Sequence, residues 1–242
     1  MRKDPEVCLP EYAQFIKHTG LREHQLEAVN LYETPDWDVS KLKEYRGFLV
    51  GGLSDDPSDR IEVTVEIYPF IKTLKAILLE AIRIRVPGVL SCGGFMLASE
   101  LLGGRLTLDQ EYREMGIVTV SKTANASSDP LLSALPGSFA IVSGHLKSTI
   151  ALPSNATLLL SSGNCPIHAF KLNESPIYAF QGHPEMTKAE LKIRVLPYKE
   201  KYFRSEKEYL DFISSEGDTS AVNNILKRFV ALVNANAFNP GN

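Results

Sequence analysis

The sequence predicts an α/β fold: a doubly wound, mostly parallel sheet that is flanked by helices and carries a small antiparallel β layer. Two observations support this prediction. In the first half of the chain, short apolar runs typical of buried strands alternate with amphipathic helical patterns. In the second half, several short β-type runs follow one another at close intervals. We expect one domain over residues 1–242, because this length is normal for a single α/β domain.

The elements of the first half follow from apolar periodicity and from helix-breaking residues. "EYAQFIKHTGL" predicts a helix that ends at Gly20, and "LEAVNLYE" predicts a short strand after it. "YRGFLVGG" predicts a buried strand that runs into a loop rich in Asp and Pro. Residues 69–85 begin with proline and carry apolar residues at helical spacing, which predicts a long helix packed on the sheet. A strand before Cys92 and a helix after it complete this half, and Gly103 and Gly104 end that helix.

The second half is dominated by strands. The runs "EMGIVTVSK", "SFAIVSG", "ATLLLSS", "IHAFKL" and "IYAFQG" are separated by Asp-Pro, Leu-Pro and Ser-Gly turns. The chain then returns to helix near its end, where five apolar residues form one stripe: Ile225, Leu226, Phe229, Val230 and Val233. The strand-rich part is therefore predicted to form the antiparallel layer.

Composition and charge exclude several classes of protein. A net charge of −3 does not suggest a nucleic-acid-binding surface, and no apolar run reaches the roughly 18 residues of a membrane span. Three widely spaced cysteines fit free thiols in a reducing compartment, so we expect a cytoplasmic protein. His18 and His24 have no cysteine or carboxylate cluster at metal-ligand spacing, so no metal and no cofactor are expected.

The stretch "GVLSCGGFMLASELLGG" places Cys92 between a predicted strand and a predicted helix. That position exposes a side chain at the carboxyl edge of the sheet, where open α/β folds place their sites. A tight turn there needs small neighbours, and Gly93 and Gly94 follow the cysteine directly. A helix N-terminus also favours a thiolate. Taken alone, this segment favours a small buried apolar side chain, which is what most free cysteines are, over a nucleophile.

A second motif, "YAFQGHPEM", supplies partners for a nucleophile. Here a predicted strand runs into His183, Pro184 and Glu185. In an extended backbone, residues i and i+2 share a face about 6.5–7 Å apart, so the Glu185 carboxylate can reach the His183 ring. A carboxylate that orients an imidazole, which in turn activates a thiol, follows the logic of a catalytic triad.

With these motifs, the sequence resembles the class I glutamine amidotransferases from about residue 45 to residue 187. The resemblance rests on "GFLVGG", on "PGVLSCGGFMLASELLGG", and on the order of turns, His and Leu-Pro in "DPLLSALPGSFAIVSGHLKSTIALPSNATLLLSSGNCPIHAF" before His-Pro-Glu. It is most similar overall to a stand-alone form of the amidotransferase part of GMP synthase. The resemblance implies a flavodoxin-like sheet and a cysteine hydrolase.

Site residues are implied by position in this resemblance. Cys92 corresponds to the acyl-accepting nucleophile, His183 to the general base, and Glu185 to the partner that orients the base. The backbone amides of Gly52 and Gly93 correspond to the oxyanion hole, where glycine lets the backbone approach a developing oxyanion closely.

Several positions depart from the family pattern or have two interpretations. Met96 stands where the family usually has a Gln that holds glutamine, and Leu90 stands where it has the first Gly of the elbow. His145 is interpreted either as a substrate contact or as a structural hydrogen-bonding residue. Cys165 is expected to serve packing, and His168 is expected at a half-exposed strand position.

Two functional hypotheses follow. The first is a hydrolase that cleaves a γ-glutamyl amide of glutamine or of a conjugate through a Cys92 thioester. Because no synthetase domain is attached, ammonia would need a separate synthetase partner, or the enzyme would act as a γ-glutamyl peptidase. The second is a non-catalytic binding or regulatory protein that keeps the fold.

The beginning of the chain also departs from the family, whose members open with an apolar strand, whereas this chain opens with "MRKDPEV". A missing strand leaves an exposed sheet edge, which invites pairing with another chain. We therefore expect "LEAVNLYE" or the strand through Leu49 to be covered by a partner chain, as in a homo-oligomer, by a rearranged segment, or by an upstream extension.

Overall fold

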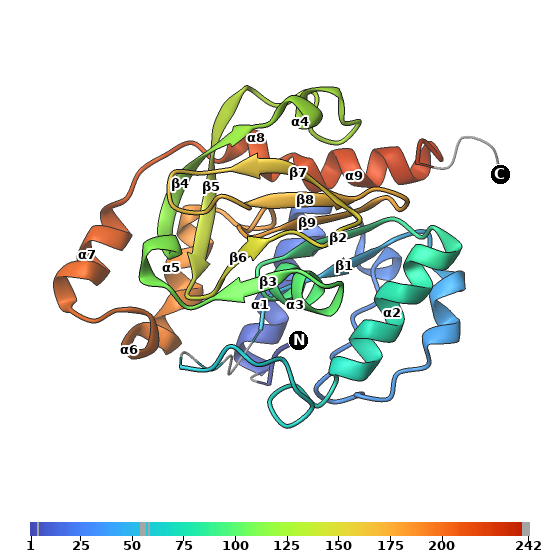
Figure 1. Cartoon of the computed structure of the whole chain (residues 1–242), viewed down its shortest axis with the longest axis horizontal. Helices are drawn as coiled ribbons and strands as arrows, with labels where there is room; N and C mark the ends of the chain where they lie inside the picture. The colour runs from blue at the N-terminus through green and yellow to red at the C-terminus, as the bar shows by residue number, and fades with distance from the viewer. Residues whose placement is uncertain (4, 54–56, 58, 239–242) are drawn as a thin grey trace.

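The computed structural model describes all residues except 4, 54–56, 58 and 239–242 (Figure 1). Part of the predicted Asp- and Pro-rich loop after Gly52, residues 54–56 and 58, therefore lies outside the described residues. Within the described part, none of the helices combines the length and the apolar character that crossing a membrane would require.

A mixed sheet of seven strands forms the centre of the molecule, in the order β1-β2-β9-β8-β7-β4-β5. A separate two-stranded antiparallel sheet pairs β3 with β6. The strands are β1 (Phe48–Val50), β2 (Gly88–Ser91), β3 (Arg105–Thr107), β4 (Glu114–Lys122), β5 (Ser138–His145), β6 (Ser148–Ala151), β7 (Ala156–Ser161), β8 (Ala169–Leu172) and β9 (Ile177–Phe180).

The prediction of a mostly parallel sheet is wrong. Only β1-β2 and β2-β9 pair in parallel, whereas β9-β8, β8-β7, β7-β4 and β4-β5 are antiparallel. The predicted small antiparallel layer is confirmed as the β3–β6 sheet, but the β-type runs that were expected to form it extend the main sheet beyond β9 instead. The reason is that the free N–H and C=O groups of a strand edge can pair with a parallel or an antiparallel neighbour. The alternation of apolar residues does not encode which of the two forms.

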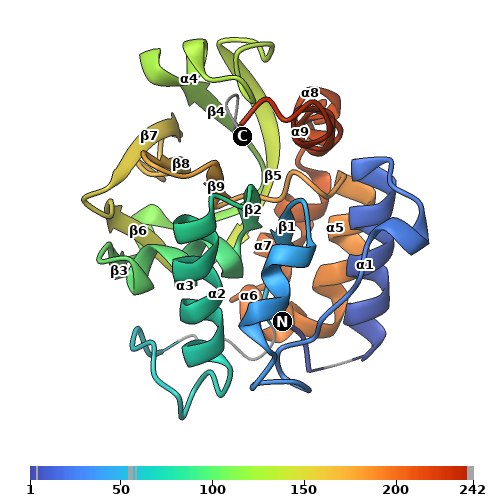
Figure 2. The ribbon, with the colours of Figure 1, turned by 90° about the vertical axis from the view of Figure 1, so that its right-hand side faces the viewer.

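Helices cover both faces of the parallel part, as Figure 2 shows for α2 and α3 on one side and α1 and α9 on the other. Successive side chains of a strand point to opposite faces of the sheet, which explains this arrangement. Val50 and Leu90 pack in the same apolar cluster as α2 and α3. Leu49 and Val89, one position earlier, pack with α1 and α9. These helices are α1 (Pro5–Thr19), α2 (Ile71–Ile84), α3 (Gly93–Leu101) and α9 (Ile225–Asn234).

The remaining helices are short, and several lie near the carboxyl ends of the strands. They are α4 (Ala124–Ser128), α5 (Lys188–Val195), α6 (Lys199–Tyr202), α7 (Glu206–Ser214) and α8 (Ser220–Asn223), with 3-10 turns η1 (Glu23–Gln25), η2 (Val39–Glu44), η3 (Gln110–Tyr112) and η4 (Leu196–Tyr198).

The N-terminal region differs in part from its prediction. Helix α1 ends as expected before Gly20, which adopts a left-handed φ of 72°. The strand predicted at residues 26–33 is absent, because Asn30 organises a turn there: its side chain contacts the N–H of Tyr32, and its carbonyl accepts from Glu33 at 2.9 Å. Strand β1 is consequently the edge of the sheet among the described residues.

Candidate functional site

Cys92 lies on a sharp turn at the carboxyl end of β2, between strand and helix. Its φ is 48°, a left-handed conformation that is costly for a residue with a Cβ atom. The turn is fixed from one side by a hydrogen bond from the Cys92 N–H to the Phe180 carbonyl of β9, at 2.8 Å. A strained non-glycine residue at the end of a central strand is typical of a functional position.

The two glycines after Cys92 are required by close packing. A Cβ on Gly93 would lie 2.8 Å from the backbone N of Leu53, and a Cβ on Gly94 would lie 2.9 Å from the carbonyl O of Val50. The chain leaving β1 thus packs directly against the turn that carries Cys92. This contact explains the Gly-Gly pair without invoking flexibility.

His183 and Glu185 follow β9 and adopt the geometry that the His-Pro-Glu motif predicted. The His183 backbone N–H donates to the Val142 carbonyl of β5 at 2.8 Å, which anchors the segment. His183 Nδ1 lies 2.6 Å from Glu185 Oε1, and the Glu185 side chain is fully buried. This contact holds one nitrogen of the ring, while the charge of Cys92 and a hydrogen bond to it also act on His183.

The electrostatics of this pair favour a protonated ring. Burial by itself lowers the pKa of His183, but the charges of Glu185 and Cys92 and hydrogen bonds to both raise it to about 10. For Glu185 the effects are reversed: burial by itself raises the pKa of its carboxyl, but the neighbouring His183 charge lowers it below its ordinary value. The structure thus brings together Cys92, His183 and Glu185 as a charge-coupled group.

The raised pKa of His183 predicts a loss of stability at alkaline pH. Because the folded-state pKa is about 10 and the ordinary value is 6.5, the unfolded chain releases this proton first. The contribution is fully present below pH 6.5 and is lost as pH rises through 10. We expect the free energy of unfolding from urea titrations to fall across this window, by at most about 1.4 kcal/mol per pH unit from this group. His183→Asn should show a smaller fall; an equal fall in both proteins would contradict the assignment.

One of the two expected oxyanion donors is already engaged. The N–H of Gly52 donates to Glu11 Oε1 at 3.1 Å, so it cannot bind a substrate oxygen while Glu11 occupies it. Gly93 is the first residue of α3, and N–H groups of a first helical turn have no acceptor within the helix. Nothing in the sequence indicates the contact between Glu11 and Gly52.

Glu11 is the centre of a buried ionic network beside the site. Its carboxylate lies 2.7 Å from Arg2 Nη2 and 2.9 Å from Arg194 Nη1. Burial alone would raise the pKa of Glu11, but the two guanidinium groups lower it well below 4.5. Arg194 Nη1 also lies 4.0 Å from Glu185 Oε1, so the network extends to the partner of His183. The run at residues 192–204, whose mixed charges are typical of a solvated face, therefore contributes a buried arginine beside the site.

A small cavity of about 40 Å³ opens over Cys92. Met96 and His145, the two expected substrate-binding residues, both line it. Lys147, Lys201 and Tyr202 also line it and were not expected in the site. The cavity is thus lined by the candidate nucleophile, a thioether, an imidazole and two lysines.

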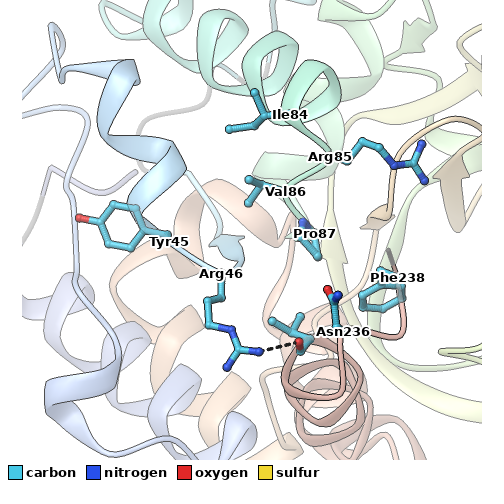
Figure 3. Close-up of a pocket in the computed structure, with 9 residues that line it drawn as sticks. Tyr45, Arg46, Ile84, Arg85, Val86, Pro87, Asn236 and Phe238 are labelled. Carbon is cyan, nitrogen blue, oxygen red and sulfur yellow. Dashed lines mark hydrogen bonds between the residues drawn. The ribbon is translucent and has the colours of Figure 1, made fainter. Parts of the chain in front are cut away.

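A larger hollow of about 190 Å³ lies at the opposite edge of the sheet, where β1 and β2 begin (Figure 3). Its arginines are used within the fold: Arg46 Nη2 donates to the Val233 carbonyl at 3.1 Å, and Arg85 Nη1 donates to the Glu174 carbonyl at 2.7 Å. Parallel strands place their functional residues at the carboxyl edge, so this hollow is separate from the candidate site.

A second Cys-His-Glu grouping lies on the antiparallel side of the sheet. One donor atom each from Glu114, His145 and Cys165 lie within 4.8 Å of one another, and all three residues are buried. This is the composition of a hydrolase triad. However, burial and the nearby Glu114 charge raise the pKa of the Cys165 thiol to about 12. His168, predicted to be half-exposed, is fully buried beside this grouping, and that prediction is wrong.

The known proteins that this chain resembles agree with one another on a single family. Gamma-glutamyl peptidase 3 of Arabidopsis thaliana is 25% identical over 218 residues, covering 88% of this chain and 83% of that protein. One subunit of the glutamine-hydrolyzing GMP synthase of Pyrococcus abyssi is 30% identical over 157 residues, covering 65% of this chain and 74% of that protein.

A solved structure shares the fold: glutamine amido transferase of Methylobacillus flagellatus superposes with a TM-score of 0.69 at 18% identity, covering 93% of this chain and 88% of that one. Residues 12–199 match the family described as "Glutamine amidotransferase class-I". The chain belongs to the class I glutamine amidotransferase family.

Proposed function

We propose that this protein hydrolyses the γ-amide bond of a γ-glutamyl compound through a thioester on Cys92. The observation that carries the proposal is the coupled group at the carboxyl edge of the sheet: a strained Cys92 beside His183, whose Nδ1 lies 2.6 Å from a buried Glu185. In this assignment Cys92 is the nucleophile, His183 the general base and Glu185 the residue that orients it.

The reaction proceeds in two steps. The Cys92 sulfur attacks the γ-carbonyl carbon while its proton resides on His183, and the C–N bond then breaks as His183 protonates the departing ammonia or amine. Water next attacks the thioester, His183 accepts a proton from it, and glutamate leaves as the thiol is restored. Glu185 stabilises the imidazolium in both steps.

Cys92 is preferred to Cys165 on physical grounds. A thiolate is the reactive form of cysteine, and the raised pKa of Cys165, about 12, keeps that thiol protonated. Cys165 is also fully buried, and its Sγ lies 3.3 Å from the Ile167 carbonyl, whereas Cys92 lines the cavity. A substrate carbonyl can therefore reach Cys92 more readily.

Met96 favours a γ-glutamyl conjugate over free glutamine as substrate. A thioether is at most a weak hydrogen-bond acceptor and tolerates apolar or bulky groups, so it offers little to a compact amide. The relative named Gamma-glutamyl peptidase 3 matches over most of its length and agrees with this alternative. The match to a GMP synthase subunit supports the other alternative, in which glutamine is hydrolysed and a synthetase partner accepts ammonia.

The test measures glutamate release from glutamine and from γ-glutamyl amides of increasing size, for the wild type and for Met96→Gln. We expect weak turnover of glutamine and better turnover of a larger amide. Met96→Gln should improve kcat/KM for glutamine about tenfold, because an unsatisfied polar ligand group costs about 1–3 kcal/mol.

Met115→Gln makes the same change on β4, outside the residues that line the cavity, and should leave the substrate preference unchanged. Efficient hydrolysis of glutamine by the wild type, with no gain in Met96→Gln, would refute the role of Met96. Absence of glutamate release from every amide tested would favour the non-catalytic alternative.

A further inference from the structure

The grouping of Glu114, His145 and Cys165 arises from strand pairing. Glu114 opens β4 and His145 closes β5, and the two residues are direct cross-strand partners, which places both side chains on one face. The connection from β7 to β8 brings Cys165 and His168 to the same place. All four side chains are at least nine-tenths buried.

Hydrogen bonds fix the tautomer of His145. Its Nδ1 lies 3.1 Å from the Lys147 carbonyl, which can only accept, so Nδ1 carries the proton. The Ser148 hydroxyl, 3.2 Å from Nδ1, donates its own hydrogen to the Tyr112 carbonyl at 2.7 Å and so accepts from Nδ1 as well. In a neutral ring, Nε2 is then a lone pair that faces Glu114 Oε2 at 3.6 Å. Two acceptors facing each other in a buried site call for a cation between them.

His168 adds a second unsatisfied ring. Its Nε2 lies 3.2 Å from the same Glu114 Oε2, but the contact lacks the alignment of a hydrogen bond. Three ring nitrogens here have no hydrogen-bond partner among the residues that the structure describes. They are Nδ1 and Nε2 of His168 and Nε2 of His145. Buried polar atoms are nearly always satisfied, so three unpaired nitrogens, two of which face one carboxylate, point to a missing ligand.

The spacing suits a tetrahedral metal ion. Zinc binds imidazole nitrogen and carboxylate oxygen at about 2.0–2.2 Å, which separates two such ligands by roughly 3.3–3.6 Å at a tetrahedral angle. The contacts of 3.6 and 3.2 Å from Glu114 Oε2 to the two rings bracket this range. One donor atom from each of Glu114, His145 and Cys165 lies within 4.8 Å of the others, and His168 lies outside this group, so metal binding requires the Cys165 sulfur and the His168 ring to shift toward the metal.

We propose that Glu114, His145, Cys165 and His168 bind one Zn²⁺ ion. Binding forms a zinc–thiolate bond and releases the Cys165 proton to solvent; the thiolate and the carboxylate then neutralise the metal charge in a buried site. Four protein ligands leave no open position, so the ion is structural rather than catalytic. It ties β4, β5 and the β7–β8 connection together and holds His145 in the wall of the cavity over Cys92.

The experiment titrates the full-length, reduced and chelator-treated protein with Co²⁺, which reports a thiolate ligand by an intense near-ultraviolet absorption band. We expect the band to saturate at about one equivalent per chain and to disappear when Zn²⁺ is added. Cys165→Ser should remove the band, and His168→Ala should weaken cobalt binding at least tenfold. Cys8→Ser and Cys92→Ser are matched controls and should retain the band.

X-ray absorption of the zinc-loaded wild type does not depend on whether a variant folds. We expect one sulfur and three nitrogen or oxygen ligands around the metal. A wild type without the thiolate band, a band retained in Cys165→Ser, or a zinc shell without sulfur would overturn the proposal. In that case a proton shared between the histidines and Glu114 would account for the cluster.

Discussion

Cys92→Ala is expected to abolish γ-glutamyl amide hydrolysis, lowering kcat by at least about 10⁴-fold. The reason is that the thioester forms on this sulfur, and the structure places no other cysteine in the wall of the cavity among its described residues. The measurement is glutamate release at saturating substrate, accompanied by circular dichroism to confirm that the fold is retained.

Two controls test whether the loss of activity is specific to Cys92. Cys8→Ala, in α1, should keep wild-type turnover. A glutamine analogue with an electrophilic diazoketone in place of the γ-amide should label Cys92, as peptide mapping would show, and it should do so in Cys165→Ser as well. Label on Cys165, or retained activity in Cys92→Ala, would transfer the nucleophile to the second Cys-His-Glu grouping.

The part of the site that the sequence predicts is local. The elbow around Cys92 and the contact between His183 and Glu185 each depend on a few consecutive residues, whose turn and extended geometry are set by neighbouring Gly and Pro. These consecutive residues are visible in the sequence, although hydrogen bonds to the Phe180 and Val142 carbonyls hold them in place in the fold. Their catalytic roles remain predictions.

The parts that the sequence could not predict depend on contacts between distant segments. Glu11 reaches Gly52 and Arg194 from α1, and its sequence context is that of an ordinary amphipathic helix. Glu114 and His168 meet only because β4 and β8 extend the same sheet. The expectation of no metal stays a prediction, and it rests on ligand spacing along the chain, which does not detect a grouping assembled across strands such as Glu114, His145 and Cys165.

For the fold, strand positions were predicted better than strand directions. β1 and β4 match the predicted runs, because alternation and turn residues mark where a strand begins and ends. Parallel or antiparallel pairing depends on tertiary connections, so most runs predicted for the antiparallel layer extend the main sheet, and β3 and β6 form the small antiparallel sheet. That residues 1–242 form one domain stays a prediction.

Glu185→Gln is expected to leave the fold intact and to lower kcat by about 10²–10⁴-fold. The amide keeps the shape of the carboxylate and can still accept from His183 Nδ1, but it carries no charge to stabilise the imidazolium that forms in each step. Arg194 keeps a partner in Glu11 at 2.9 Å, so no buried guanidinium is left unpaired. Both kcat and the pH dependence of turnover should therefore change together, while urea denaturation still shows one cooperative transition.

Glu114→Gln is the matched control, since it makes the same change at the buried carboxylate of the other grouping. If Cys92, His183 and Glu185 act as the triad, the Glu114 variant loses much less activity than the Glu185 variant and shows its main effect on cobalt binding. A loss below about tenfold in Glu185→Gln, equivalent to about 1.4 kcal/mol in the barrier, would mean that Glu185 serves only structure. A larger loss in Glu114→Gln than in Glu185→Gln would instead place the catalytic carboxylate on β4.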